Sequence, residues 1–155
     1  MDINTQNRYN EDPMITEDYV SFEIAKLLKE KGFDIPCDNY YDSSGKTPNE
    51  SVYGGANIET LDYNADPFVK SGFHKFKTFS APTQAMAMKW LRDEKNLCIE
   101  PYRTACGYLS TISKIPTGSE LYAQEYEGDD EDSGQFTTYE KSCEAAIKYC
   151  LEKLI

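Results

Sequence analysis

The feature that most constrains the fold of this chain is a regular apolar stripe near its C-terminus. Between residues 139 and 154, apolar side chains recur at the i, i+3, i+4 spacing that places them on one face of a helix. Thr138 precedes the stripe and is a suitable N-cap. Such a helix is stable only when another layer of structure covers its apolar face, so other parts of the chain must pack there. The stripe consists of Cys143, Ala146, Ile147, Cys150, Leu151 and Leu154.

A second helix is indicated near the start of the chain. It is expected to begin with Thr16 as the cap, because Glu17 and Asp18 then occupy the first turn, where the helix dipole favours negative charge. Gly32 can adopt the left-handed conformation that ends a helix. The apolar stripe between these ends is Val20, Ile24, Leu27 and Leu28.

A third helix is expected after residue 80. Ser80 is a good cap, and Pro82 suits the first turn because its backbone angle is already helical. The pattern ends near Asn96. The apolar face predicted for this helix is Met86, Ala87, Trp90 and Leu91.

Short aromatic and β-branched runs between turn residues predict strands in the rest of the chain. Residues 37–41 and 51–53 are expected to pair across a Ser-Gly turn, with further strands at 73–79, 97–99, 108–112 and 121–126. The expected fold class is α+β, with about three helices packed on one face of a mainly antiparallel sheet. Residues 1–14 are polar and are expected to be a flexible N-terminal segment, and residues 15–155 a single domain.

The chain is strongly acidic. Among its 155 residues, 27 Asp and Glu against 16 Lys and Arg give a formal net charge of −11. This field repels nucleic-acid backbones and anionic membranes, so neither is expected as a partner. Surface carboxylates can also imitate DNA phosphates, although solubility is the simpler explanation of the charge. No apolar run approaches the roughly 18 residues of a membrane span, and the first residues lack a signal-peptide pattern, so we expect a cytoplasmic protein.

Residue types that commonly carry catalysis or bind metals are few. The chain has one histidine, His74, and five cysteines, no two of which form a CxxC pair. This pattern predicts reduced thiols rather than disulfides or a zinc site, and Cys143 and Cys150 are expected in the core. The sequence also lacks a phosphate-binding glycine-rich loop and a GxSxG turn. We therefore expect no catalytic residues, no cofactor and no metal.

Two segments are candidate binding sites. In the first, lysines alternate with aromatic side chains, as in strands that stack bases and contact phosphates, although lysines on an edge strand also protect it from aggregation. The second is an acidic run that is either a contact surface or a solvated loop. The candidate residues are Lys70, Phe73, His74, Lys75, Phe76 and Lys77 in the basic segment and Asp129, Asp130, Glu131 and Asp132 in the acidic segment.

Three blocks of the sequence carry a family resemblance. They are ITEDYVSFEIAKLLKEKGF at residues 15–33, SAPTQAMAMKWLR at 80–92, and YEK with AAIKYCLE at 139–141 and 145–152. Together they resemble a group of small uncharacterised proteins encoded by phages and prophages of gut Bacteroides-type bacteria. The blocks coincide with the three expected helices, so they indicate a shared scaffold. The acidic segment departs from the usual pattern of that group.

The resemblance implies a function by binding in the host cytoplasm rather than by catalysis. The first hypothesis is a non-enzymatic acidic interaction protein that binds a host or phage protein. The second is a small-ligand or nucleotide-binding protein that sequesters its ligand, for example in counter-defence. The third is an inhibitor that mimics DNA.

Overall fold

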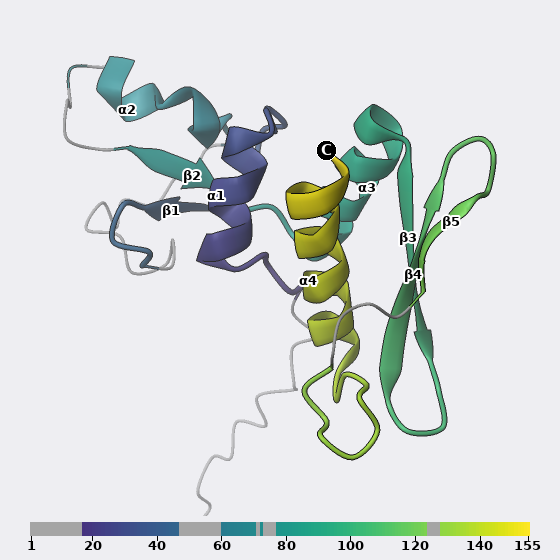
Figure 1. Cartoon of the computed structure of the whole chain (residues 1–155). Helices are drawn as coiled ribbons and strands as arrows, with labels where there is room; N and C mark the ends of the chain where they lie inside the picture. The colour runs from purple at the N-terminus through teal and green to yellow at the C-terminus, as the bar shows by residue number, and fades with distance from the viewer. Residues whose placement is uncertain (1–16, 47–59, 71, 73–76, 124–127) are drawn as a thin grey trace, which may run out of the picture.

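The computed structural model describes residues 17–46, 60–70, 72, 77–123 and 128–155 (Figure 1). In chain order its longer helices are α1 (Phe22–Glu30), α3 (Gln84–Lys95) and α4 (Tyr139–Tyr149), with a π-helical turn η3 (Cys150–Leu154) continuing α4. The short helices are η2 (Tyr63–Ala65) and α2 (Pro67–Lys70). The strands are β1 (Tyr40–Asp42), β2 (Thr78–Ser80), β3 (Leu97–Arg103), β4 (Tyr108–Lys114) and β5 (Glu120–Ala123).

The predicted α+β class is confirmed, with the strands divided between two small antiparallel sheets. One sheet pairs β1 with β2, and the other has the order β3-β4-β5. In Figure 1 the helices α1, α3 and α4 lie between the two sheets, with α1 next to β1 and β2 and with α3 and α4 next to β3 and β4. The long helices are therefore a central layer that both sheets cover.

The core lies where the three long helices meet. Most members of the predicted apolar stripes are buried there, because α1 and α3 both pack against α4 and each helix also packs against a strand. Full burial of one such aliphatic side chain contributes about 1.5–3 kcal/mol. The buried residues are Ile24, Ala25 and Leu28 of α1, Ala87, Trp90 and Leu91 of α3, and Ala146 and Ile147 of α4, with Cys150 and Leu151 of η3.

The prediction that the first helix begins at Thr16 is wrong. Ser21 is the N-cap of α1, and its side chain accepts a hydrogen bond from the backbone N–H of Ile24. The preceding residues are extended, because the backbone N–H of Val20 donates to the Pro82 carbonyl oxygen at 3.0 Å. The predicted end is confirmed, since Gly32 follows the helix in a left-handed conformation with a φ of 83°.

The third predicted helix, α3, also starts later than expected. Its cap is Thr83 and not Ser80, which belongs to β2. Its end at Asn96 is confirmed, and this residue has a left-handed φ of 56°. The cap of the C-terminal helix is the predicted one, since the Thr138 side chain accepts a hydrogen bond from the backbone N–H of Lys141.

The described partner of β1 is β2. Tyr40 pairs with Ser80 and Asp42 with Thr78, so a strand from the end of the expected 73–79 region completes this sheet. Residues 51–53 lie outside the described residues. The strands predicted at 97–99 and 108–112 are confirmed and are longer than expected. The described part of the strand predicted at 121–126 belongs to β5, and residues 124–126 lie outside the described residues.

Pro101 suits the edge position of β3. The Thr104 N–H donates to the Gly107 carbonyl oxygen at 2.8 Å, so this pair at the turn is hydrogen-bonded. Hydrogen-bonded and non-bonded pairs alternate along an antiparallel ladder, so Pro101, which pairs with Ser110, falls at a non-bonded position. Its nitrogen then points away from β4, and no ladder bond is lost. The proline also removes one N–H with which another strand could pair.

Candidate functional site

An acidic cleft lies between the N-terminal ends of α3 and α4. The extended residues before α1 form its third wall, and its volume is about 190 Å³. Glu17 and Asp18 line it from this extended segment, Gln84 and Met88 from α3, and Tyr139 and Glu140 from α4. Segments more than 120 residues apart in the sequence therefore form one hollow.

Backbone hydrogen bonds and helix caps hold the three walls in place. The Gln84 N–H donates to the Asp18 carbonyl oxygen at 2.8 Å, which joins the extended segment to the first turn of α3. The hydroxyls of Thr83 and Thr138 cap the two helices. Because the cap positions fix where each helix begins, they also fix the side chains at the mouth of the cleft.

A hydrogen-bonded glutamate ties the walls together beneath the cleft. The Glu144 carboxylate accepts from the backbone N–H of Ser21 at 3.1 Å and from Nε2 of Gln84 at 3.3 Å. Gln84 Nε2 also donates to the carbonyl oxygen of Glu140 at 3.1 Å. Both partners of this nitrogen are acceptors, so the orientation of the Gln84 amide is fixed with its oxygen on the other side.

Three carboxylates make the charge of the cleft negative, and no described residue pairs with them. Glu17, Asp18 and Glu140 form no ion pair with any described residue. The two lysines of α4 nearest in sequence to the cleft are engaged elsewhere, since Lys141 pairs with Asp129 and Lys148 with Glu23. The described residues therefore supply carboxylates to the cleft but no positively charged side chain that pairs with them.

The pKa values of neighbouring groups respond to this negative field. The pKa of the Cys143 thiol is raised to about 11, mainly by burial and in smaller part by the carboxylates of Glu140, Asp18 and Glu144, while a hydrogen bond with Tyr139 lowers it. Burial also raises the pKa of Tyr139, to which Glu140 contributes. Both shifts favour the uncharged form, as expected where negative charges gather.

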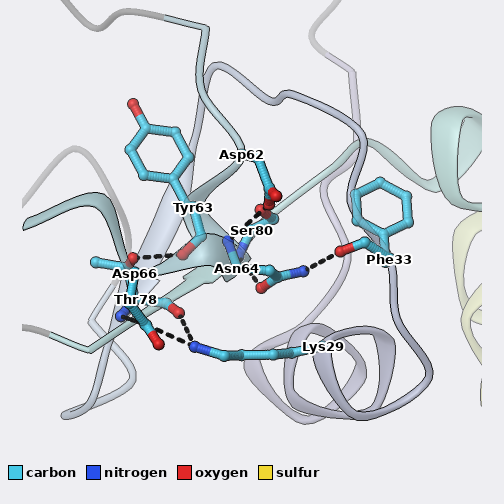
Figure 2. A network of polar contacts seen from close by, with 8 residues as sticks. All are labelled: Lys29, Phe33, Asp62, Tyr63, Asn64, Asp66, Thr78 and Ser80. Carbon is cyan, nitrogen blue, oxygen red and sulfur yellow. Dashed lines mark hydrogen bonds and ion pairs between the residues drawn. The ribbon is translucent and has the colours of Figure 1, made fainter. Parts of the chain in front are cut away.

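A second polar cluster joins α1 to η2 and β2 (Figure 2). The ammonium group of Lys29 donates to the Asp66 carboxylate at 2.7 Å and to the Thr78 carbonyl oxygen at 2.9 Å. The same carboxylate accepts from the Thr78 N–H at 3.2 Å. The Thr78 hydroxyl in turn donates to the Tyr63 carbonyl oxygen at 2.7 Å.

Asn64 forms the other half of this cluster. Its side-chain Nδ2 donates to the Phe33 carbonyl oxygen at 2.7 Å, and its Oδ1 accepts from the Ser80 N–H at 2.9 Å. Asp62 caps the short helix η2 by accepting from the Asn64 N–H. These hydrogen bonds fasten η2 to the residues that follow α1 and to β2.

Ser80 and Cys37 are buried beside this cluster. The Ser80 hydroxyl is the one fully enclosed side-chain oxygen or nitrogen without a hydrogen-bond partner among the described residues. Burial raises the pKa of the Cys37 thiol to about 12, and the Asp38 carboxylate contributes to the rise. Since a thiol and not a thiolate is present at neutral pH, Cys37 is not a nucleophile here.

The basic segment predicted as a binding site is described only at its ends. Lys70 and Lys77 are exposed, and neither forms an ion pair with a described residue. Phe73, His74, Lys75 and Phe76 lie outside the described residues.

Two of the four predicted contact residues of the acidic segment, Asp129 and Asp130, bond to other residues of the chain. Asp129 accepts from the Thr137 N–H at 2.8 Å and pairs with Lys141. These bonds hold the pKa of Asp129 well below its usual range. Asp130 accepts from the Asp132 N–H at 3.0 Å and from the Ser133 hydroxyl. Glu131 and Asp132 are exposed, so they are the acids of this segment that remain available for a contact.

The described residues, including the acids of the cleft, contain no group of three or more His, Cys, Asp or Glu side chains arranged to hold a metal ion. None of the described helices has the length and apolar character needed to cross a membrane.

No protein-family model, curated protein or solved structure matches this chain. The site is therefore interpreted from its own geometry.

The sequence analysis does not predict the cleft or the role of Glu17 and Asp18 as its lining residues. Glu17 and Asp18 were expected in the first turn of a helix, where they would have served its dipole. Their place in an extended segment beside α4 follows from tertiary pairing with residues 82–84, for which the local sequence carries no signal.

Proposed function

We propose that this chain is a non-enzymatic interaction protein, of phage or prophage origin, that binds a partner protein of the host or phage through its acidic cleft. The observation that carries the proposal is the set of three carboxylates, Glu17, Asp18 and Glu140, which line a hollow and form no ion pair with a described residue. A basic side chain of a partner would supply the missing charge.

The aromatic wall of the cleft supports the same proposal. The side chain of Tyr139 is 43% exposed, although it also packs edge-to-face against Tyr108 with ring centroids 6.2 Å apart. Tyrosine is enriched in the centres of protein interfaces because it offers a large apolar surface at a low entropic cost. Met88 adds an adaptable apolar contact on the opposite helix.

The size and charge of the cleft favour a protein partner over the nucleotide alternative. Its volume of about 190 Å³ falls below the roughly 300–1,000 Å³ of sites that enclose small molecules. A nucleotide would also bring phosphates toward three carboxylates, which repel them. One side chain projecting from a larger surface suits both properties.

Two triple variants with equal net charge test the proposal. The cleft variant is Glu17→Gln, Asp18→Asn and Glu140→Gln, and the matched surface variant is Glu94→Gln, Glu131→Gln and Asp132→Asn. Each removes three negative charges, which changes the net charge of −11 to −8. Circular dichroism checks that both variants are folded, and an array of basic peptides of about 15 residues measures binding.

We expect the natural chain and the surface variant to bind the same basic peptides and the cleft variant to lose them. Equal losses in both variants would mean that the peptides respond to net charge alone, and the proposal would then fail. The surface variant also tests the contact role of Glu131 and Asp132.

A further inference from the structure

We propose that the acidic cleft selects an arginine of the partner, whose guanidinium enters between Gln84 and Tyr139. The inference rests on the proposed function and names the chemistry of the residue that the cleft recognises.

Gln84 provides the observation that is independent of the acids. It is only 8% exposed, yet its side chain lines the cleft. Its Nε2 is committed to Glu140 and Glu144, while its Oε1 accepts no hydrogen bond from any described residue. Among the described side chains, only Ser80 has a polar atom that is both fully enclosed and without a hydrogen-bond partner. The Gln84 oxygen also lacks a partner among the described residues, so it is not fully enclosed and retains contact with solvent. This oxygen is therefore an unused acceptor of a residue that lines the cleft.

Most of the polar side-chain groups at this end of the cleft are acceptors only. The carboxylates of Glu17, Asp18 and Glu140 accept hydrogen bonds, as does the Gln84 oxygen. A ligand that satisfies several of them at once must carry several donors. Guanidinium carries five N–H donors in one plane and is not deprotonated in proteins.

The spread of the acids argues against a metal ion as the ligand. Although three carboxylates line the cleft, no group of three such side chains in the described chain lies close enough to hold a metal. The acceptors instead surround a hollow of about 190 Å³, which suits a planar cation with donors on several sides. A small spherical cation would leave most of these acceptors unsatisfied.

Tyr139 and Met88 distinguish arginine from lysine. An arginine side chain places its apolar stem against a surface such as Met88 and stacks its flat cationic head on an aromatic ring. The Tyr139 ring lines the cleft beside Glu140, so one side chain can contact the ring and a carboxylate together. Lysine has a compact, strongly hydrated ammonium group and gains less from the ring.

Three fluorescent peptides test this selection. They have the sequence Gly-Gly-X-Gly-Gly, with X as arginine, lysine or citrulline, and binding to the natural chain is measured by fluorescence anisotropy. Citrulline has nearly the shape of arginine without its charge. We expect arginine to bind at least about threefold more tightly than lysine, and citrulline to show no saturable binding.

Two variants examine the roles of the walls. Tyr139→Leu keeps an apolar side chain at an exposed position and should weaken the arginine peptide by about two- to fivefold, with a smaller effect on the lysine peptide. Gln84→Met removes the free acceptor and should bring the affinities for arginine and lysine closer together. Because Gln84 also ties α3 to α4, circular dichroism verifies its fold, and the Tyr139 variant tests selection independently.

The outcomes separate this inference from the proposed function. In one outcome the arginine and lysine peptides bind equally to the natural chain, and the cleft variant Glu17→Gln, Asp18→Asn, Glu140→Gln binds neither. The proposed selection for arginine is then wrong, whereas the proposed binding of a basic side chain in the cleft is supported. If neither peptide shows binding that the cleft variant abolishes, and the basic peptide array shows none either, both proposals are wrong.

Discussion

At the scale of single residues, polar side chains that stabilise the fold differ from those of the cleft in whether they have hydrogen-bond partners. Lys29 and Asp66 are mostly buried, with side chains 23% and 29% exposed, and they share their hydrogen bonds with Thr78. The carboxylates of Glu17, Asp18 and Glu140 line a hollow and have no such partners among the described residues.

Removal of Asp66 tests the structural role of the first group. Asp66→Ala leaves the Lys29 ammonium and the Thr78 N–H without their acceptor, so we expect the free energy of unfolding to fall by about 1–3 kcal/mol in urea titrations. The control is Asp93→Ala, which breaks an exposed pair with Lys89 on one helix face. That control should change stability little. Equal losses in the two variants would contradict a structural role for the Lys29 cluster.

The cysteines provide a second residue-scale prediction. Burial raises the pKa of Cys37 and Cys150 to about 12, whereas Cys106 is exposed at the turn between β3 and β4. Since only the thiolate reacts, Cys106 should react first with iodoacetamide at about pH 8. Cys37, Cys143 and Cys150 should react only after unfolding. Peptide mass spectrometry locates the label, and fast labelling of any of these three in the folded chain would contradict their burial.

At the scale of elements, the segment between β5 and α4 is an ordered connection over its described part. The N–H of Gly128 donates to the Gly134 carbonyl oxygen at 2.9 Å, and Asp129 reaches forward to Thr137 and Lys141. The composition of this segment predicted a solvated loop, because five acids and two glycines suggest little more. The bonds of Asp129 instead fasten the loop to the start of α4.

Asp129→Asn weakens this attachment by removing the charge that pairs with Lys141. We expect faster backbone amide exchange for residues 130–137, measured by hydrogen–deuterium exchange, because the loop then opens more often. The matched change Glu131→Gln affects an exposed acid of the same loop and should leave exchange there unchanged. Equal acceleration by both changes would show that Asp129 has no special part in ordering the loop.

The element scale also shows what local sequence predicts well. The end of α3 at Asn96 and the cap of α4 at Thr138 follow from local rules, and both are confirmed. The predicted start of α1 at Thr16 is wrong because residues 18–20 pair with residues 82–84. Local helix propensity does not predict such long-range pairing. The strand partner of residues 40–42 is likewise decided by distant packing.

At the scale of the whole molecule, helix packing creates the cleft. The antiparallel sheet and the buried helix faces were predictable, because alternation and helical periodicity recur along the chain. The cleft was not, since Glu17, Asp18 and Glu140 become neighbours only when α3 and α4 pack together and the extended segment pairs beside them. The acid count predicts a negative surface but does not predict where unpaired acids meet.

The most direct test of the cleft is to map where a basic ligand binds. The amide spectrum of the ¹⁵N-labelled chain is recorded while the arginine peptide Gly-Gly-Arg-Gly-Gly is added. The proposed function predicts saturable shifts at residues 17–18, 83–88 and 139–140, and predicts their loss in the cleft variant. Shifts centred on residues 129–132, or small changes spread over the whole acidic surface, would contradict it.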